Sequence, residues 1–197
     1  LDALLARASG VAPEHAGRLA DTARAAGIEV RGVMGYEGHV VGNPDRLWRI
    51  EQVERSMDLL LKAHDDVGGA VTSAGGTGTF DLHHWVGEVQ AGSFLLMDTH
   101  YAQLGLPFGQ ALSIVATVVS VNVDAGYAVA DAGLKAFGMD HGEPAVVDHT
   151  MFFTSDEHAT FVPSTARALN VGDRVTMLPA HVDPTMSQHE RGHVVRD

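Results

Sequence analysis

The sequence has no cysteine and only two lysines, Lys62 and Lys135, among its 197 residues. The missing thiols exclude disulfides and thiolate metal sites. The formal net charge is −12, and no basic run occurs, which argues against a nucleic-acid partner. No apolar stretch approaches the about 18–20 residues of a membrane-spanning helix, and residues 1–10 lack the order of a secretory signal. We therefore expect a soluble, cytoplasmic protein without membrane contacts.

Helical and strand patterns alternate in the first hundred residues, and an apolar content of 45% suffices for a core. The predicted helices are Asp2–Ala8, Pro13–Ala25, a long helix opened by Asn43-Pro44-Asp45 and running to about His64, and a short one near Asp81–Val86, which begins close to His83 and His84. The predicted strands are Ile28–Met34 and Gly69–Ser73. This alternation indicates a parallel β/α arrangement.

The pattern changes from about Gly109 onward, where short β-branched runs are separated by Gly, Pro and Asp. The predicted strands are Ser113–Val121, Tyr127–Ala130, Ala145–Val147, Met151–Thr154, Ala159–Val162 and Arg174–Leu178. Such a series is typical of an antiparallel β-domain. We therefore predict a boundary near residues 103–110, with domains over 1–105 and 106–197.

A glycine-rich segment, Thr72–Thr79, follows the second predicted strand. It matches neither the P-loop nor the G-x-G-x-x-G fingerprint. Its glycines allow backbone N–H groups to approach an anion, the hydroxyls of Ser73 and Thr77 can donate, and a following helix would add a favourable field. The alternative is a tight turn that needs the conformational freedom of glycine. The sequence leaves a phosphate site and a structural turn equally open.

Polar residues also follow the first predicted strand, in the segment Gly35–His39. In a β/α barrel this end of the strands forms the active face. Tyr36 is a candidate to contact a cofactor, and His39 is a candidate base or contact to metal-bound water. The alternative for Tyr36 is a core aromatic with its hydroxyl at the rim.

His181 and Asp183 lie one residue apart, between Pro179 and Pro184. On an extended segment both side chains leave the same face, and the flanking prolines stiffen the backbone. An imidazole and a carboxylate together suit a divalent metal. By itself, however, a His-x-Asp pair is a weak signal.

Six segments in order resemble the D-threonine aldolase and D-serine dehydratase family, which is related to alanine racemase. They are Met34–His39, Ser73–Thr79, Glu88–Ser93 with Met97-Asp98 and Tyr101, Asp131–Ala136, Ser155–His158 and Pro179–Asp183. The resemblance implies a β/α (TIM-type) barrel that binds pyridoxal phosphate, followed by the antiparallel β-domain. Family dehydratases carry His-x-Cys with zinc and aldolases carry His-x-Asp, so Asp183 favours an aldolase using Mn²⁺ or Mg²⁺.

The resemblance also implies roles for individual residues. Ser73, Gly75, Gly76 and Thr77 would hold the cofactor's phosphate, with Tyr36 near its ring and Tyr101 a weaker contact. His181 and Asp183 would bind the metal, and His39 would act as the base. The implied reaction cleaves a β-hydroxy-D-amino acid into glycine and an aldehyde, in a protein that is a homodimer when complete.

The chain departs from the family pattern in lacking a lysine at the Schiff-base position, because Lys62 falls on the long helix and Lys135 in the β-domain. Gly10-Val11-Ala12 also joins two helices between which the family has a barrel strand. We interpret the chain as a partial version of the enzyme, inactive alone. The alternatives are a dehydratase that releases a keto acid and ammonia, and a protein that binds pyridoxal phosphate without catalysis or is an inactive fragment.

Overall fold

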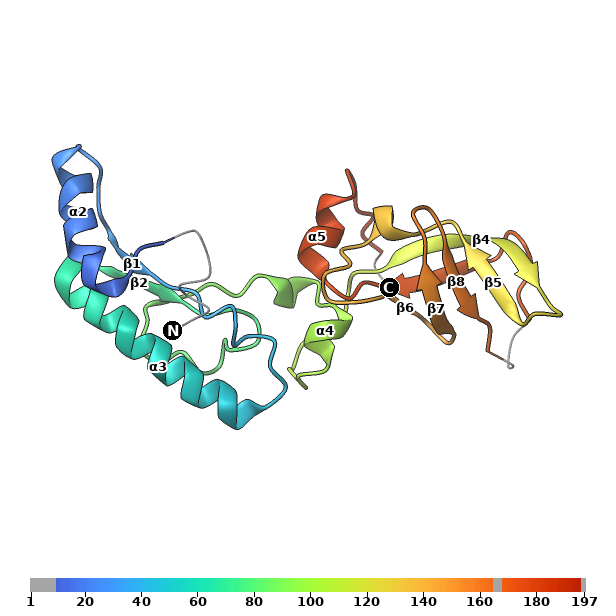
Figure 1. Ribbon diagram of the computed structural model, residues 1–197, viewed down its shortest axis with the longest axis horizontal. Helices are drawn as coiled ribbons and strands as arrows, with labels where there is room; N and C mark the ends of the chain where they lie inside the picture. Colours follow the sequence, from blue (N-terminus) through green and yellow to red (C-terminus); the bar gives the residue numbers. More distant parts are fainter. Residues whose placement is uncertain (1–9, 165–167, 196–197) are drawn as a thin grey trace. The chain divides into compact units, whose positions relative to one another are not determined.

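The structure, a computed structural model, describes residues 10–164 and 168–195 (Figure 1). The chain divides into two compact units, Leu1–Phe94 and Leu95–Asp197, called here the first and the second unit. The helix predicted over Asp2–Ala8 lies outside the described residues. Across the described residues, no helix combines the length and the apolar character needed to cross a bilayer.

The first unit is built on a parallel sheet of three strands, ordered β1-β2-β3. The strands are β1 (Gly32–Met34), β2 (Val71–Ala74) and β3 (Glu88–Val89), and the helical segments are η1 (Pro13–His15), α2 (Ala16–Ala25) and α3 (Arg46–Val67). Helix α3 connects β1 to β2 and contacts both β1 and α2. The predicted β/α alternation is confirmed. Over residues 10–94 the sheet does not close, so the TIM-type barrel stays a prediction.

Helix α3 shows how the sequence sets this arrangement. The Asp45 side chain accepts a hydrogen bond from the Trp48 N–H (3.1 Å), so Asp45 is the N-cap and Pro44 precedes the helix instead of starting it. Buried residues recur every three or four positions along the helix: Arg49, Val53, Met57, Leu60, Ala63 and Val67. This spacing places one stripe of the helix against the core.

The prediction of a short helix near Asp81–Val86 is wrong, because this segment forms turns and irregular backbone. The chain must be extended again at Glu88 to pair with β2, and the His83 side chain is fully buried against Glu37. Tertiary contacts thus override a weak local helical preference. The glycine-rich segment is therefore not followed by a helix N-terminus.

The second unit is an antiparallel sheet ordered β6-β9-β4-β5-β8-β7. Its strands are β4 (Ile114–Asn122), β5 (Tyr127–Ala130), β6 (Ala145–Val146), β7 (Thr150–Thr154), β8 (Ala159–Val162) and β9 (Arg174–Leu178). The outermost strands β6 and β7 also contact each other, so the sheet nearly closes around a core that includes Val118, Phe161 and Met177. The predicted antiparallel β-domain is confirmed, with each strand within a few residues of its expected range.

The division between the units lies at Phe94 and Leu95, about ten residues before the predicted boundary. The short helix α4 (Thr99–Ala102) belongs to the second unit, where its N-terminal end is bonded. Its Thr99 N–H donates to the Pro179 carbonyl (3.0 Å), which follows β9. The sequence predicts the boundary around Gly105–Gly109, where the pattern changes, whereas the hydrogen bond of Thr99 joins the segment before it to the second unit.

Candidate metal site

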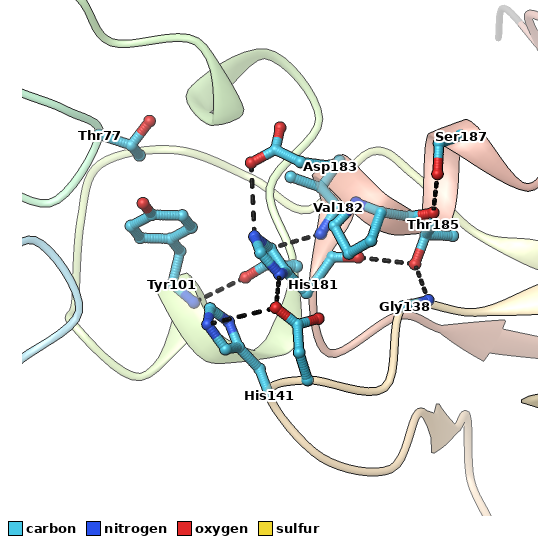
Figure 2. Close-up of polar contacts among 12 residues, drawn as sticks. Thr77, Tyr101, Gly138, His141, His181, Val182, Asp183, Thr185 and Ser187 are labelled. Carbon is cyan, nitrogen blue, oxygen red and sulfur yellow. Dashed lines mark hydrogen bonds and ion pairs between the residues drawn. The ribbon is translucent and has the colours of Figure 1, made fainter. Parts of the chain in front are cut away.

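His181 and Asp183 lie at the start of helix α5 (Val182–Ser187), in the second unit. His181 is the N-cap with extended backbone (φ −142°, ψ 119°), and Asp183 is in the first helical turn. The sequence predicts that the pair lies on one extended segment, and this prediction is wrong, because Asp183 is already helical. The side chains nevertheless converge, with 3.4 Å between His181 Nε2 and Asp183 Oδ2 (Figure 2).

Two further histidines and a second carboxylate lie around His181. Asp140 Oδ2 lies 2.7 Å from His181 Nδ1, at hydrogen-bond distance. The His141 ring stacks on the His181 ring with centroids 4.0 Å apart and planes 12° apart, and the His100 ring lies 4.2 Å from that of His141. Asp140, His141 and His181 present ligand atoms within 4.8 Å of one another. Of this cluster, the sequence predicts only His181 and Asp183 as metal ligands.

Buried hydrogen bonds fix the backbone that carries His181. Asp98 is fully buried, and its two carboxylate oxygens accept from the N–H groups of Tyr101 (2.8 Å) and Val182 (2.9 Å). The Thr185 hydroxyl donates to the His181 carbonyl (2.6 Å) and accepts from the Gly138 N–H (2.9 Å). The loop before Asp140 and the first turn of α5 are thereby joined (Figure 2).

The surroundings of the cluster lower the pKa values of Asp140 and His141, and so favour an ionised Asp140 and a neutral His141. Burial raises the pKa of Asp140, but the hydrogen bond with His181 and the attraction of His181 and His141 outweigh it and leave that pKa below its usual value. Burial, together with repulsion from His181 and His100, lowers the pKa of His141. Neutral imidazoles and carboxylates are the forms that bind metal ions.

The His181 and Asp183 pair fits a divalent ion. Two ligands at about 2.0–2.2 Å from one ion lie between about 2.8 Å apart, at octahedral angles, and about 3.6 Å apart, at tetrahedral angles. The observed separation of 3.4 Å falls in that range. The cluster around His181 offers three imidazoles and two carboxylates as possible donors, and no thiolate.

Tyr36 and His39 follow β1 in the first unit and line a cavity of about 900 Å³. Its other walls are mainly apolar residues of α2, α3 and β1. Tyr36 also packs on the glycine-rich segment, because a Cβ added to Gly76 would lie 3.1 Å from its ring. The structure brings Tyr36 and Gly76 together, while the catalytic role of His39 stays a prediction.

The residues predicted to hold a phosphate are buried and bonded within the chain. The Ser73 hydroxyl donates to Glu88 (2.6 Å). The N–H groups of Gly75 and Gly76 donate to Glu37 (3.3 Å) and to the Thr79 hydroxyl (3.2 Å). The Thr77 hydroxyl accepts from the Phe94 N–H (3.0 Å). With two carboxylates among the acceptors, the segment does not fit a phosphate group in this arrangement.

Glu37 and His83 form a buried pair that the sequence analysis missed. Glu37 Oε1 accepts from His83 Nε2 (2.6 Å) and from the Thr79 hydroxyl (2.7 Å), and both paired side chains are fully buried. A Cβ on Gly75 would lie 2.7 Å from the His83 ring, so glycine is required there for packing. Gly75 also has a left-handed backbone (φ 88°), so the alternative of a turn that needs glycine accounts for this position.

The remaining predicted contact, Tyr101, lies buried on α4 in the second unit. Lys135, also in the second unit, pairs with Glu157, and Lys62 is exposed on α3 of the first unit. The sequence held one signal for the missed metal-site residues, since Asp140 and His141 are adjacent. Nothing in their spacing indicates that they meet His181, which is forty residues downstream of His141.

Comparisons with known proteins agree with the resemblance in sequence. Residues 111–195 match the model of a putative serine dehydratase domain. The chain is 30% identical over 190 residues to a 3-hydroxy-D-aspartate aldolase of Paracoccus denitrificans (strain Pd 1222), covering 85% of this chain and 48% of that protein. It is 32% identical over 188 residues to a D-threonine aldolase of an Arthrobacter species, covering 87% and 49%.

The crystal structure of D-threonine aldolase from Filomicrobium marinum superposes with a TM-score of 0.83 at 28% identity, covering 94% of this chain and 55% of that one. The chain thus spans about half the length of the relatives that it matches. The six ordered segments and these relatives lead to the same assignment. Over most of its length the chain is similar to D-threonine and 3-hydroxy-D-aspartate aldolases, and over residues 111–195 to the putative serine dehydratase domain.

Proposed function

We propose that this chain carries the divalent-metal site of a lyase that cleaves β-hydroxy-D-amino acids into glycine and an aldehyde. The observation that supports this most directly is the convergence of His181 Nε2 and Asp183 Oδ2 at 3.4 Å, in a relative of D-threonine aldolases. A bound divalent ion would supply a Lewis acid for the substrate's β-hydroxyl. The carboxylate of Asp183 favours Mn²⁺ or Mg²⁺ over Zn²⁺.

The residues of the second unit would orient that ion. His181 and Asp183 supply one nitrogen and one oxygen, and the hydrogen bonds of Asp98 and Thr185 hold their backbone in place. The family resemblance adds pyridoxal phosphate as a second cofactor. Because the donors of the glycine-rich segment are bonded to Glu37, Glu88 and Thr79, no step is assigned to that cofactor.

The main alternative is a dehydratase, which the match to a putative serine dehydratase domain favours. Product analysis separates the two reactions, since an aldolase yields glycine and an aldehyde whereas a dehydratase yields a keto acid and ammonia. We expect no turnover from this chain alone with D-threonine, Mn²⁺ and pyridoxal phosphate.

The direct test of function is a chimera in which residues 95–197 replace the matching part of the Arthrobacter D-threonine aldolase. We expect Mn²⁺-dependent release of glycine and acetaldehyde, and loss of that activity on Asp183→Ala. Circular dichroism shows whether each chimera folds. A folded chimera that produces keto acid and ammonia would support the dehydratase, and a folded chimera without turnover would support a non-catalytic protein.

A further inference from the structure

We propose that Asp140 is a positioning residue for the metal site, holding His181 in the tautomer that leaves Nε2 free to bind the ion. This inference rests on the proposed role of His181 and Asp183 as metal ligands. Asp140 is outside the predicted His-x-Asp pair, and it acts on the metal through His181.

The two nitrogens of the His181 ring face different carboxylates. Nδ1 lies 2.7 Å from Asp140 Oδ2, the length of a strong hydrogen bond to a charged acceptor. Nε2 lies 3.4 Å from Asp183 Oδ2, which is longer than an ordinary hydrogen bond of this type. A neutral imidazole carries one ring proton, so the shorter contact places that proton on Nδ1. Nε2 then keeps its lone pair.

The same distances argue against an alternative arrangement in which Asp140, His141 and His181 all bind the ion directly. The 3.4 Å gap matches two ligands of one ion, whereas an ion shared by His181 Nδ1 and Asp140 would have to break a 2.7 Å hydrogen bond. A histidine ligand whose second nitrogen donates to a carboxylate is a recurring arrangement in metal sites, where it fixes the ring and raises its basicity.

The fold holds Asp140 against His181. The Gly138 N–H donates to the Thr185 hydroxyl, which itself donates to the His181 carbonyl. A Cβ on Gly138 would lie 2.2 Å from Pro184 Cγ, so this approach needs glycine. The loop carrying Asp140 is therefore attached to the same turn of α5 that carries His181.

The substitutions Asp140→Ala and Asp140→Asn test the proposal, because the Asp140 side chain is 55% exposed and its loss should leave the fold intact. Asp124→Asn, in the exposed turn between β4 and β5, is the matched control. Nitrogen-15 NMR of the metal-free full chain, at a pH where the rings are neutral, reports which His181 nitrogen carries the proton. Mn²⁺ titration followed by electron paramagnetic resonance reports affinity.

We expect protonation at Nδ1 in the native chain and in Asp124→Asn, and a shift toward protonation at Nε2 in Asp140→Ala. Mn²⁺ affinity should fall about 10–100-fold in Asp140→Ala, and less in Asp140→Asn, which keeps an acceptor. His141→Gln should change the affinity little.

A proton on Nε2 of His181 in the native chain would overturn the proposal, as would unchanged Mn²⁺ affinity in Asp140→Ala. Loss of binding in His141→Gln comparable to that in Asp183→Ala would favour the arrangement with three direct ligands and also overturn it. Failure of the native chain to bind Mn²⁺ would contradict the proposed function, and the tautomer measurement would still decide the relation between Asp140 and His181.

Discussion

At the scale of single residues, one imidazole ring connects the features of the second unit. His181 has a carboxylate at each nitrogen and a second imidazole stacked on its face. A ring held on three sides loses little further freedom when a ligand binds, which favours affinity. The chemistry of the site then depends mainly on the donor atom at position 183.

Replacing Asp183 by cysteine should change metal preference. A carboxylate oxygen is a hard ligand and a thiolate a soft one, so Asp183→Cys should raise affinity for Zn²⁺ relative to Mn²⁺. Competition titrations with both ions on the native and variant chains measure the ratio, and Asp124→Cys controls for a thiol added elsewhere. An unchanged ratio would remove Asp183 from the ligand set.

The buried pair of Glu37 and His83 should make the first unit sensitive to acid. Burial raises the pKa of Glu37, but hydrogen bonds from His83 and Thr79 outweigh it and leave the pKa below its ordinary value of 4.5. The folded state therefore favours the ionised form. This contribution to stability is complete above the unfolded pKa and is lost as the pH falls through the folded pKa.

The substitution Glu37→Gln should therefore lower the free energy of unfolding by about 1–3 kcal/mol at pH 7. The deficit should shrink as the pH falls below 4.5, where the Glu37 carboxylate of the unfolded chain takes up a proton while that of the folded chain stays ionised. Urea unfolding can be followed by tryptophan fluorescence, because Trp48 and Trp85 both lie in the first unit. A deficit that stays constant from pH 7 to pH 3.5 would contradict the role of the Glu37 charge.

At the scale of helices and strands, the sequence predicted most clearly the elements with strong local patterns. The β-branched run at β4 and the apolar stripe of α3 gave the correct element types. The segment Asp81–Val86 was mistaken for a helix because its local pattern says nothing of the buried contact between His83 and Glu37. The local pattern also predicts extended backbone at Val182, where α5 begins, because it says nothing of the hydrogen bond between Val182 and Asp98.

The start of α5 depends on Asp98, which is buried and accepts two backbone hydrogen bonds. Asp98→Ala should leave the Tyr101 and Val182 N–H groups without this acceptor, at a cost of about 1–3 kcal/mol for each. Hydrogen exchange should show faster exchange at the Val182 amide, and urea unfolding should give the total loss. Native-like protection of Val182 in the variant would show that Asp98 does not hold α5.

At the scale of the whole molecule, each unit has its own sheet and its own buried core. The resemblance to the D-threonine aldolase and D-serine dehydratase family rests on six segments that occur in the family's order along the chain. The contacts that complete each site were not predictable, since Asp140 lies 41 residues from His181 and Glu37 lies 46 residues from His83. Pairings at such separations follow from the tertiary fold, which residue spacing does not encode.

The chain should form no specific Schiff base with pyridoxal phosphate. The hydrogen bond with Glu157 raises the pKa of Lys135, so its amine is protonated at neutral pH and is a poor nucleophile. Lys62 is exposed on α3. After incubation with pyridoxal phosphate and borohydride, mass spectrometry should find only weak, non-saturable labelling of either lysine. Saturable labelling of Lys135 would contradict the prediction that neither lysine of this chain forms the Schiff base.

The measurement that bears most directly on the central claim is a Mn²⁺ titration of the full chain by electron paramagnetic resonance, with His181→Ala and Asp183→Ala in parallel and Asp124→Asn as the control. We expect a single saturable Mn²⁺ site in the native chain and the control, and its loss in both site variants, while circular dichroism shows all four proteins folded. A native chain that binds no Mn²⁺, or folded His181→Ala and Asp183→Ala variants that bind it as the native chain does, would contradict the claim that these two residues form a metal site.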